Sequence, residues 1–272
     1  MLSLTPRDIR DFRRTVYRYY RAHRRDMPWR WVDDPYKVFV SEVMLQQTQV
    51  ERVYDKYRAF LRAFPTLAAL RRAPLKRVLA AWQGLGYNRR ALALSRAAAL
   101  IATRHGGKIP DEVECLQALP GIGAASAGAI RAFAFNKPSI IIETNIRSVF
   151  IHHFFQNRRR VPDDRIRALV EATLDRRRPR EWYYALMDYG VSIKEKFGNP
   201  ARRGKAYRRQ PRFEGSDRQV RGHIVKTLVR AGRADHATLC AKIGCGQERI
   251  RPLLGALVAE ELIRKEGCLY FI

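Results

Sequence analysis

The chain has 272 residues, 46% of them hydrophobic, which is enough for one large core or two modest ones. Its 53 Lys and Arg against 26 Asp and Glu give a formal net charge of +27, and a field of that sign attracts polyanions. No run of about 18 apolar residues is present, which excludes a membrane-spanning helix. The composition predicts a nucleic-acid-binding protein, with a merely soluble or ribosomal-type basic protein as the alternative.

Apolar residues recur at helical spacing up to about residue 212, so this part of the chain is predicted to be almost entirely α-helical. Proline and glycine divide it into separate helices. The expected helices cover residues 5–24, 41–64, 66–72, 74–82, 89–105, 111–118, 124–135, 144–155, 162–176 and 180–193.

The character of the chain changes after residue 193. Residues 194–212 hold eight Lys and Arg and one Glu, which predicts a basic loop with its linker part at 196–212. Three helical patterns at 216–231, 235–243 and 246–261 and a hairpin turning at Glu266-Gly267 follow. They predict a winged-helix-like domain over 213–272. Its last helix, with Arg249 and Arg251, would bind duplex DNA; the alternative is a small packing module.

The cysteines and the N-terminus indicate a cytoplasmic protein. Cys115, Cys240, Cys245 and Cys268 form no CxxC pair, so neither a disulfide framework nor a metal site is predicted. The stretch MLSLTPRDIRDF carries acids early and has no apolar segment, unlike a signal peptide.

A glycine turn precedes the helix expected at 124–135. In Leu119-Pro120-Gly121-Ile122-Gly123, the glycines Gly121 and Gly123 flank an apolar anchor, Ile122. Glycine lets the backbone approach a ligand closely, and a helix N-terminus offers unpaired N–H groups to an anion. The turn therefore predicts a phosphate clamp, with an ordinary helix–helix turn as the alternative.

Glu42 is the acid in an otherwise apolar run, Val38 to Leu45. Burial would raise its pKa and keep it partly protonated near neutrality. A protonated acid suits cleavage of a purine N-glycosidic bond, because protonation of N7 makes the base a better leaving group. The alternative is a Glu on a helix surface or at a helix cap.

Glu143 is a second candidate carboxylate, between the apolar run 140–142 and Thr144-Asn145. It would cap the next helix, or it would act on a sugar, either by balancing its positive charge or by attacking it as a nucleophile. One protonated and one ionised carboxylate would form a glycosidase pair.

Two polar stretches are candidates for contacts with bases. Gln46 to Gln49 directly follow the Glu42 run, and Leu85 and Tyr87 lie in Gly84-Leu85-Gly86-Tyr87-Asn88. Such side chains can bond base edges or act as a wedge in the stack. The alternatives are a helix surface for the glutamines and core positions for Leu85 and Tyr87.

Several motifs, taken in order, closely resemble the MutY adenine DNA glycosylases of the helix-hairpin-helix superfamily. They are Met27–Arg30, Asp34–Tyr36, SEVMLQQTQV, Trp82–Tyr87, LPGIG and AGAI, and the resemblance covers about residues 10–195. It implies a mainly α fold with double-stranded DNA between two helical lobes, 26–136 and 1–25 plus 137–195. Endonuclease III and the mismatch thymine glycosylases are neighbours in the superfamily.

The resemblance also implies roles for individual residues. Glu42 matches the acid that protonates adenine, and Asn145 matches an Asn beside the second catalytic carboxylate. The other matches are Gln47 and Tyr87 for insertion into the stack with Leu85 beside them, Trp29 and Arg30 for the adenine pocket, and Gly121 and Gly123 for the phosphate-binding hairpin.

The chain departs from the family at the catalytic positions. Glu143 stands where the family has Asp, and a shift of about 1 Å can cost ~10²-fold in rate. Ala125 stands in the base pocket where endonuclease III has its Schiff-base Lys, so lyase chemistry is not expected. A small residue at this place also admits more than one base.

The chain departs from the family in its C-terminal part as well. The family's four cluster-binding Cys follow the segment matching Tyr189-Gly190, yet no Cys lies between 116 and 239. We therefore expect no iron–sulfur cluster, no metal and no other cofactor. Cations of the basic loop would hold DNA phosphates instead: Arg202, Arg203, Lys205, Arg208 and Arg209. The family's Nudix-like domain, which reads 8-oxoguanine, is replaced by the winged-helix-like domain. The preference for the base opposite the adenine is therefore not predicted by the resemblance.

These observations lead to one hypothesis and two alternatives. The hypothesis is a monomeric, monofunctional glycosylase in base excision repair that flips and excises adenine opposite G or 8-oxoguanine, in the nucleoid of a prokaryotic cytoplasm. The first alternative changes the base to a mismatched T or U or to hypoxanthine. The second is a non-catalytic lesion-binding or regulatory winged-helix protein.

Overall fold

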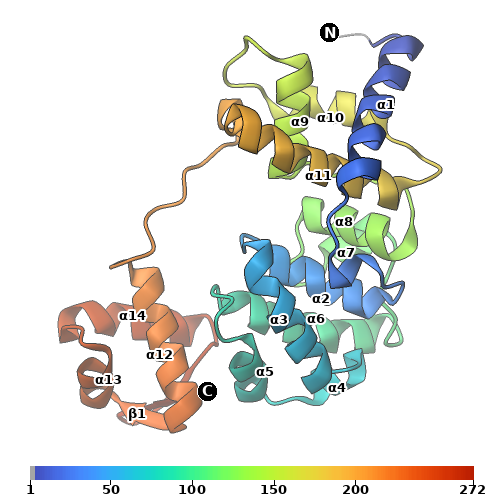
Figure 1. Ribbon diagram of the computed structural model, residues 1–272. Helices are drawn as coiled ribbons and strands as arrows, with labels where there is room; N and C mark the ends of the chain where they lie inside the picture. Colours follow the sequence, from blue (N-terminus) through green and yellow to red (C-terminus); the bar gives the residue numbers. More distant parts are fainter. Residues whose placement is uncertain (1–3) are drawn as a thin grey trace. The chain divides into compact units, whose positions relative to one another are not determined.

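The computed structural model describes residues 4–272 and is mainly helical, as predicted (Figure 1). The chain packs into two compact units. Unit 1 contains the residues up to Phe39, Asp111–Ala118 and Ile122–Arg209, and unit 2 contains Val40–Pro110, Leu119–Gly121 and Gln210–Ile272. The predicted lobes, 26–136 and 1–25 plus 137–195, group the residues differently and stay a prediction, and residues 1–3 of the second lobe lie outside the described chain.

Unit 1 is built around the long helix α11 (Pro179–Phe197), which packs against α1 (Pro6–His23), α9 (Thr144–Phe154) and α8 (Ala124–Phe135). Figure 1 shows α1, α9, α10 and α11 grouped together. The remaining elements are η1 (Pro28–Arg30), α7 (Val113–Gln117), α10 (Asp163–Thr173) and η2 (Pro200–Arg203). The fully buried Trp182 and Tyr183 of α11 place the core along this helix.

Unit 2 holds a group of four consecutive helices: α3 (Val50–Ala63), α4 (Leu67–Arg72), α5 (Leu75–Trp82) and α6 (Arg89–Arg104). Helix α6 packs against α4 and α5, and the buried Trp82 and Phe60 meet edge to face with centroids 5.8 Å apart. Helix α2 (Pro35–Leu45) begins in unit 1 and ends in unit 2.

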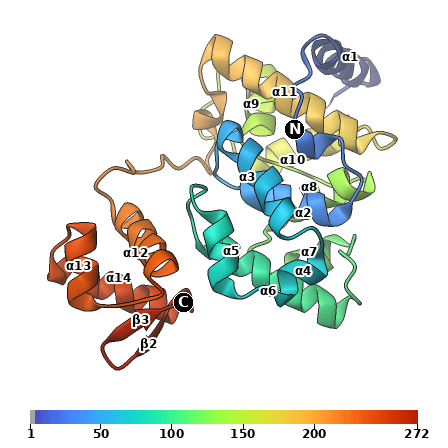
Figure 2. The same cartoon turned by 60° about the horizontal axis from the view of Figure 1, so that its bottom comes forward.

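The C-terminal part of unit 2 has the element order of a winged helix (Figure 2). It runs α12 (Asp217–Ala231), β1 (Arg233–Asp235), α13 (His236–Ile243), α14 (Gln247–Ala259), β2 (Arg264–Glu266) and β3 (Leu269–Phe271). Across residues 210–272, all described, the strands form one antiparallel sheet in the order β1-β3-β2. The predicted helices and hairpin are confirmed, whereas the three-residue β1 was not predicted because it is too short to show an alternating pattern.

Two sequence predictions about helices are wrong. The single helix expected at 41–64 is two helices, α2 and α3, and Gln47 lies between them with a left-handed φ of 53°. Helix α11 continues to Phe197, so the basic loop begins after that residue and contains η2. No helix within residues 4–272 is long and apolar enough to cross a membrane.

Candidate functional site

Arg90, near the start of α6, joins the two loops that were predicted to contact bases. One terminal nitrogen, Nη1, donates to the carbonyls of Val43, Met44 and Gln46 at 2.5–3.0 Å. The other, Nη2, donates at 2.9–3.1 Å to the Thr48 hydroxyl and the carbonyls of Leu85 and Gly86. Arg90 therefore caps the end of α2 and fixes residues 85–86 beside it.

The break in the predicted helix 41–64 follows from these bonds. The carbonyls of Val43 and Met44 would accept backbone N–H groups if α2 continued, and Arg90 occupies them instead. Burial lowers the pKa of Arg90 to about 10, which leaves the guanidinium charged at neutral pH.

Gln47 and Tyr87, the two residues predicted to enter the base stack, share an unusual backbone. Their φ angles are 53° and 49°, in the left-handed region that non-glycine residues seldom adopt. Strain of this kind is often found at functional sites. Gln47 is exposed and Tyr87 is half-buried. Leu85, in contrast, is only 4% exposed, which agrees with the alternative prediction that it is a core residue.

The glycine turn lies between α7 and α8, and Gln46 contacts it by donating from Nε2 to the carbonyl of Gly121 at 3.1 Å. Gly121 has a φ of 77°, and a Cβ there would lie 2.8 Å from Ala93 Cβ, so a side chain would clash. Ile122 is buried as the predicted anchor. Gly123 is the N-cap of α8 and provides no side-chain cap, which leaves N–H groups of that helix start available to an anion.

Two further predicted residues lie on helices α2 and α8. Glu42 is half-buried near the C-terminal end of α2, between the buried Ser41 and Val43. Ala125 is the second residue of α8 and is exposed.

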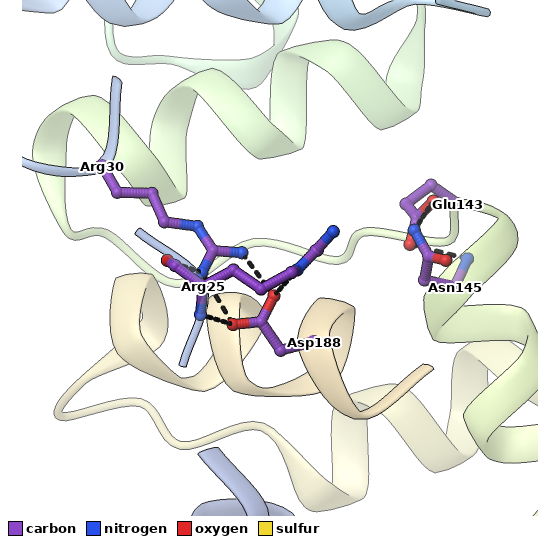
Figure 3. Close-up of polar contacts among 5 residues, drawn as sticks. All are labelled: Arg25, Arg30, Glu143, Asn145 and Asp188. Atoms are coloured by element: carbon purple, nitrogen blue, oxygen red, sulfur yellow. Dashed lines mark hydrogen bonds and ion pairs between the residues drawn. The ribbon is translucent and has the colours of Figure 1, made fainter. Parts of the chain in front are cut away.

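Glu143 is the N-cap of α9, the capping role that was one of its predicted alternatives (Figure 3). Its Oε1 accepts from the backbone N–H groups of Asn145 and Ile146 at 2.8 and 2.9 Å. Its Oε2 accepts from Asn145 Nδ2 at 3.2 Å. The carboxylate is thus fixed at a helix start, where the helix dipole favours negative charge.

Asn145 is held tightly beside Glu143. Its buried Oδ1 has no hydrogen-bond partner within residues 4–272. A Cβ at Gly190 of α11 would lie 2.5 Å from the carbonyl oxygen of Asn145, so only glycine allows α11 to pass this close. The start of α9 is therefore rigidly positioned by α11.

Arg30, predicted to line a base pocket, is committed to a buried ion pair. Its Nη1 and Nη2 donate to the two carboxylate oxygens of Asp188, both at 2.8 Å (Figure 3). Arg25 adds a contact at 2.6 Å from Nε, and the Arg30 guanidinium lies 4.6 Å from the ring centre of Tyr184. Trp29 beside it is 3% exposed.

The environment of Asp188 keeps it ionised. Burial alone would raise its pKa, but hydrogen bonds and charge from Arg30, with further help from Arg25, outweigh burial and lower the pKa below the usual value. With Asp188 1% and Arg30 4% exposed at the side chain, this is a bidentate ion pair largely removed from water.

The predicted phosphate-binding cations of the basic loop divide into two groups. Arg203 donates to the carbonyls of Phe155 and Gln156 after α9, so it serves the fold. Arg202, Lys205, Arg208 and Arg209 are exposed. The loop itself is anchored by a parallel bridge in which Val161 N bonds Arg203 O and Lys205 N bonds Val161 O.

The cysteines are free thiols, and within residues 4–272 no three His, Cys, Asp or Glu side chains gather as a metal site. The expectation that the chain holds no iron–sulfur cluster stays a prediction.

Sequence reasoning missed Arg90 and Asp188. Asp188 had a signal, because it is an acid in the mostly apolar stretch Trp182–Ile193, the same argument that singled out Glu42. Arg90 had none, since it is one cation among 53.

The fold of this chain is shared with known proteins. A thermostable thymine-DNA glycosylase structure shares the fold, with a TM-score of 0.62 at 23% identity over 67% of this chain and 86% of that chain. The profile of the HhH-GPD superfamily base excision DNA repair proteins matches residues 40–173.

Two curated relatives share more of the sequence, at 34% and 35% identity. An adenine DNA glycosylase of Mycobacterium tuberculosis is 34% identical over 82% of this chain and 79% of its own length. Another, from Buchnera aphidicola, is 35% identical over 64% of this chain, which spans half the length of that protein. The chain therefore belongs to the HhH-GPD superfamily of base excision DNA repair proteins.

Proposed function

We propose that this chain is a DNA glycosylase that flips adenine out of a mismatched duplex and cleaves its N-glycosidic bond. Membership of the HhH-GPD superfamily and the similarity to adenine DNA glycosylases support the glycosylase class. We further propose that the base opposite the adenine is G or 8-oxoguanine.

The observation that carries the proposal is the Arg90 cluster, in which Arg90 holds Val43, Met44, Gln46, Thr48, Leu85 and Gly86. One half-buried cation, Arg90, fixes the end of the helix that bears Glu42 and the loop that bears Tyr87. Gln47 and Tyr87 are both held in left-handed conformations in these two loops. Preorganised side chains of this kind suit insertion into a base stack, because the backbone cost is met on folding and not on DNA binding.

The chemistry assigned to this chain requires two carboxyl groups. Glu42 donates a proton to N7 of the flipped adenine, so that the base leaves as a neutral purine. The Glu143 carboxylate, fixed at the start of α9, balances the positive sugar until water adds to it. Trp29, Arg30 and Ala125 are assigned to the base pocket by resemblance, Arg30 acting through its ion pair with Asp188.

The phosphate contacts are assigned to two places. The N–H groups at the start of α8, after Gly121 and Gly123, bind one phosphate. The exposed cations of the basic loop, Arg202, Lys205, Arg208 and Arg209, bind others.

A substrate panel tests the proposal. The protein is incubated with labelled duplexes carrying A opposite 8-oxoguanine, A opposite G, T opposite G, U opposite G, or hypoxanthine, and each strand is then cleaved at abasic sites with alkali. Cleavage of the A strands alone is expected. Cleavage of the T, U or hypoxanthine strands would replace the base assignment. DNA binding without cleavage of any strand would favour the lesion-binding alternative.

Two finer features belong to the same proposal: the protein acts without an iron–sulfur cluster and without β-lyase activity. Ala125 supplies no amine for a Schiff base, so strands should remain intact until alkali is added. The purified protein should show no absorption band near ~400 nm, where such clusters absorb. Strand nicking before alkali would contradict the absence of β-lyase activity. A brown protein would contradict the absence of the cluster.

A further inference from the structure

A cationic pocket lies in unit 2, between the loops of the Arg90 cluster and α12 of the C-terminal part. It has a volume of about 930 Å³, and Gln47, Tyr87 and Phe213 are among its lining residues. No Asp or Glu lines it, and within residues 4–272 its lining cations are Arg52, Arg89, Arg218, Arg221, Lys226 and Arg230. The lining predicts an anionic ligand.

Three of these cations are already engaged by the protein. Arg221 and Arg89 share Glu260 at 2.5 and 3.7 Å. Arg218 donates to the Tyr87 hydroxyl at 2.6 Å, which ties α12 to the loop of the Arg90 cluster.

The other three cations, Arg52, Lys226 and Arg230, are exposed and have no ion-pair partner within residues 4–272. Lys226 and Arg230 are four residues apart on α12, so they lie on one face of the helix. The opposite face is buried through Val220, Ile224 and Leu228. The helix thus uses one face for the core and offers the other to a ligand.

Two uncharged features of the pocket also point to a ligand. Phe213 is 52% exposed, with the Arg218 guanidinium 5.4 Å from its ring centre, and an open aromatic ring beside cations is a platform for a nucleobase. Gly222 lies in the middle of α12, and no atom lies within 4 Å of the place where its Cβ would be. Glycine weakens a helix interior, and no packing contact requires it at this place.

We propose that this pocket binds a stretch of DNA strand, with phosphates on Arg52, Lys226 and Arg230 and a base stacked on Phe213. The inference rests on the proposed function, because it takes DNA as the ligand. It makes α12 the DNA-binding helix of the C-terminal part. The helix predicted from sequence, α14, is less suited, since its Arg249 is held by Asp217 at 2.9 Å and by the carbonyl of Gly215 at 2.6 Å.

A pair of charge variants tests the proposal through the salt dependence of DNA binding. Affinity for a fluorescent duplex containing an abasic-site analogue opposite G is measured by anisotropy at several salt concentrations. Lys226→Gln/Arg230→Gln should flatten the slope of log K against log salt by about 2 and weaken binding roughly 10- to 30-fold near 0.15 M salt. The control, Lys242→Gln/Arg251→Gln, removes the same charge from α13 and α14 and should change binding much less. Equal losses in the two variants, or a larger loss in the control, would overturn the proposal.

A pair of glycine variants tests close approach at α12. Gly222→Ala and Gly255→Ala each add one methyl group to a helix interior where no atom lies within 4 Å, and both should keep or raise Tm. Gly222→Ala alone should weaken binding to the same duplex several-fold. Unchanged binding by Gly222→Ala would overturn close contact at this helix.

A pair of aromatic variants tests stacking in the pocket. Phe213→Leu should weaken binding to the duplex about tenfold, a loss that follows from a stacking energy of ~1–3 kcal/mol per base, and Phe213→Trp should restore it. Phe197→Leu, at the exposed end of α11, is the control. Equal behaviour of the two leucine variants would exclude the stacking role. Wild-type excision of adenine on the substrate panel decides the proposed function independently of all three pairs.

Discussion

Cationic side chains serve opposite purposes in two regions of this molecule. In unit 1, Arg25 and Arg30 converge on one buried carboxylate, Asp188, at 2.6–2.8 Å. In unit 2, the pocket beside α12 keeps Lys226 and Arg230 exposed, and no Asp or Glu lines it. The first region uses its charges to fix the fold, and the second keeps them available for a ligand.

The difference shows that net charge by itself does not locate a binding surface. A cation paired inside the protein has already lost its water and found its partner, so it adds little to the outer field. A cation without a partner releases counterions when a phosphate arrives, and this release supports DNA binding. A net charge of +27 therefore indicates a binding surface only where the cations are not already paired within the protein.

The largest effect on stability should come from Asp188→Ala. It would leave Arg30 buried without its counter-ion, and we expect the free energy of unfolding in urea to fall by about 3–5 kcal/mol. Asp11→Ala is the control, because its pairs with Arg7 and Arg14 are exposed and should contribute under about 1 kcal/mol. Similar losses in both variants would remove the distinction between paired and exposed charge.

Arg90→Lys should have the next largest effect. Lysine keeps the charge but cannot fork between the six acceptors that Arg90 reaches from 2.5 to 3.1 Å. Loosened loops should lower adenine excision about 10²-fold at saturating DNA. Arg104→Lys in the last turn of the same helix is the control. A change in KM alone, with the excision rate intact, would show that Arg90 does not position the reacting groups.

Glu143→Ala should have a smaller effect on stability, about 1 kcal/mol, because α9 loses its N-cap. Glu143→Asp keeps a capping carboxylate and should recover most of that loss in urea unfolding. If both variants unfold like the wild type, the hydrogen bonds to Asn145 and Ile146 contribute nothing to stability.

The smallest effect concerns acid pH. Because the folded-state pKa of Asp188 is lowered, the stability contributed by its ionisation is complete above the unfolded value of about 3.9 and is lost as pH falls through the folded value. The wild type should therefore lose stability below about pH 4 more steeply than Asp188→Asn. Parallel losses of Tm in the two proteins would place the acid sensitivity elsewhere.

Much of the helical fold could be predicted from the sequence. Helix α8 has the predicted bounds, because a glycine turn precedes it and Asn136 ends it in a left-handed conformation. The break between α2 and α3 could not be predicted, since glutamines are good helix formers and the reason for the break, Arg90, lies more than 40 residues away.

The candidate site could be predicted in part. The capping role of Glu143 was visible from its place before a helix, and the positions of Gln47 and Tyr87 came from resemblance. The pocket beside α12 could not be found, because it joins Tyr87 to Arg218 across 131 residues. Tertiary packing, and no local pattern, creates that pocket.

The role of Glu42 is tested most directly by single-turnover excision of adenine from a duplex with G or 8-oxoguanine opposite. Glu42→Gln keeps the size of the side chain and removes its transferable proton, so the excision rate should fall by about 10²–10⁴-fold while DNA affinity is retained. Glu51→Gln, on the exposed start of α3, should excise adenine at the wild-type rate. Excision by Glu42→Gln at the wild-type rate would contradict the assignment of Glu42 as the proton donor.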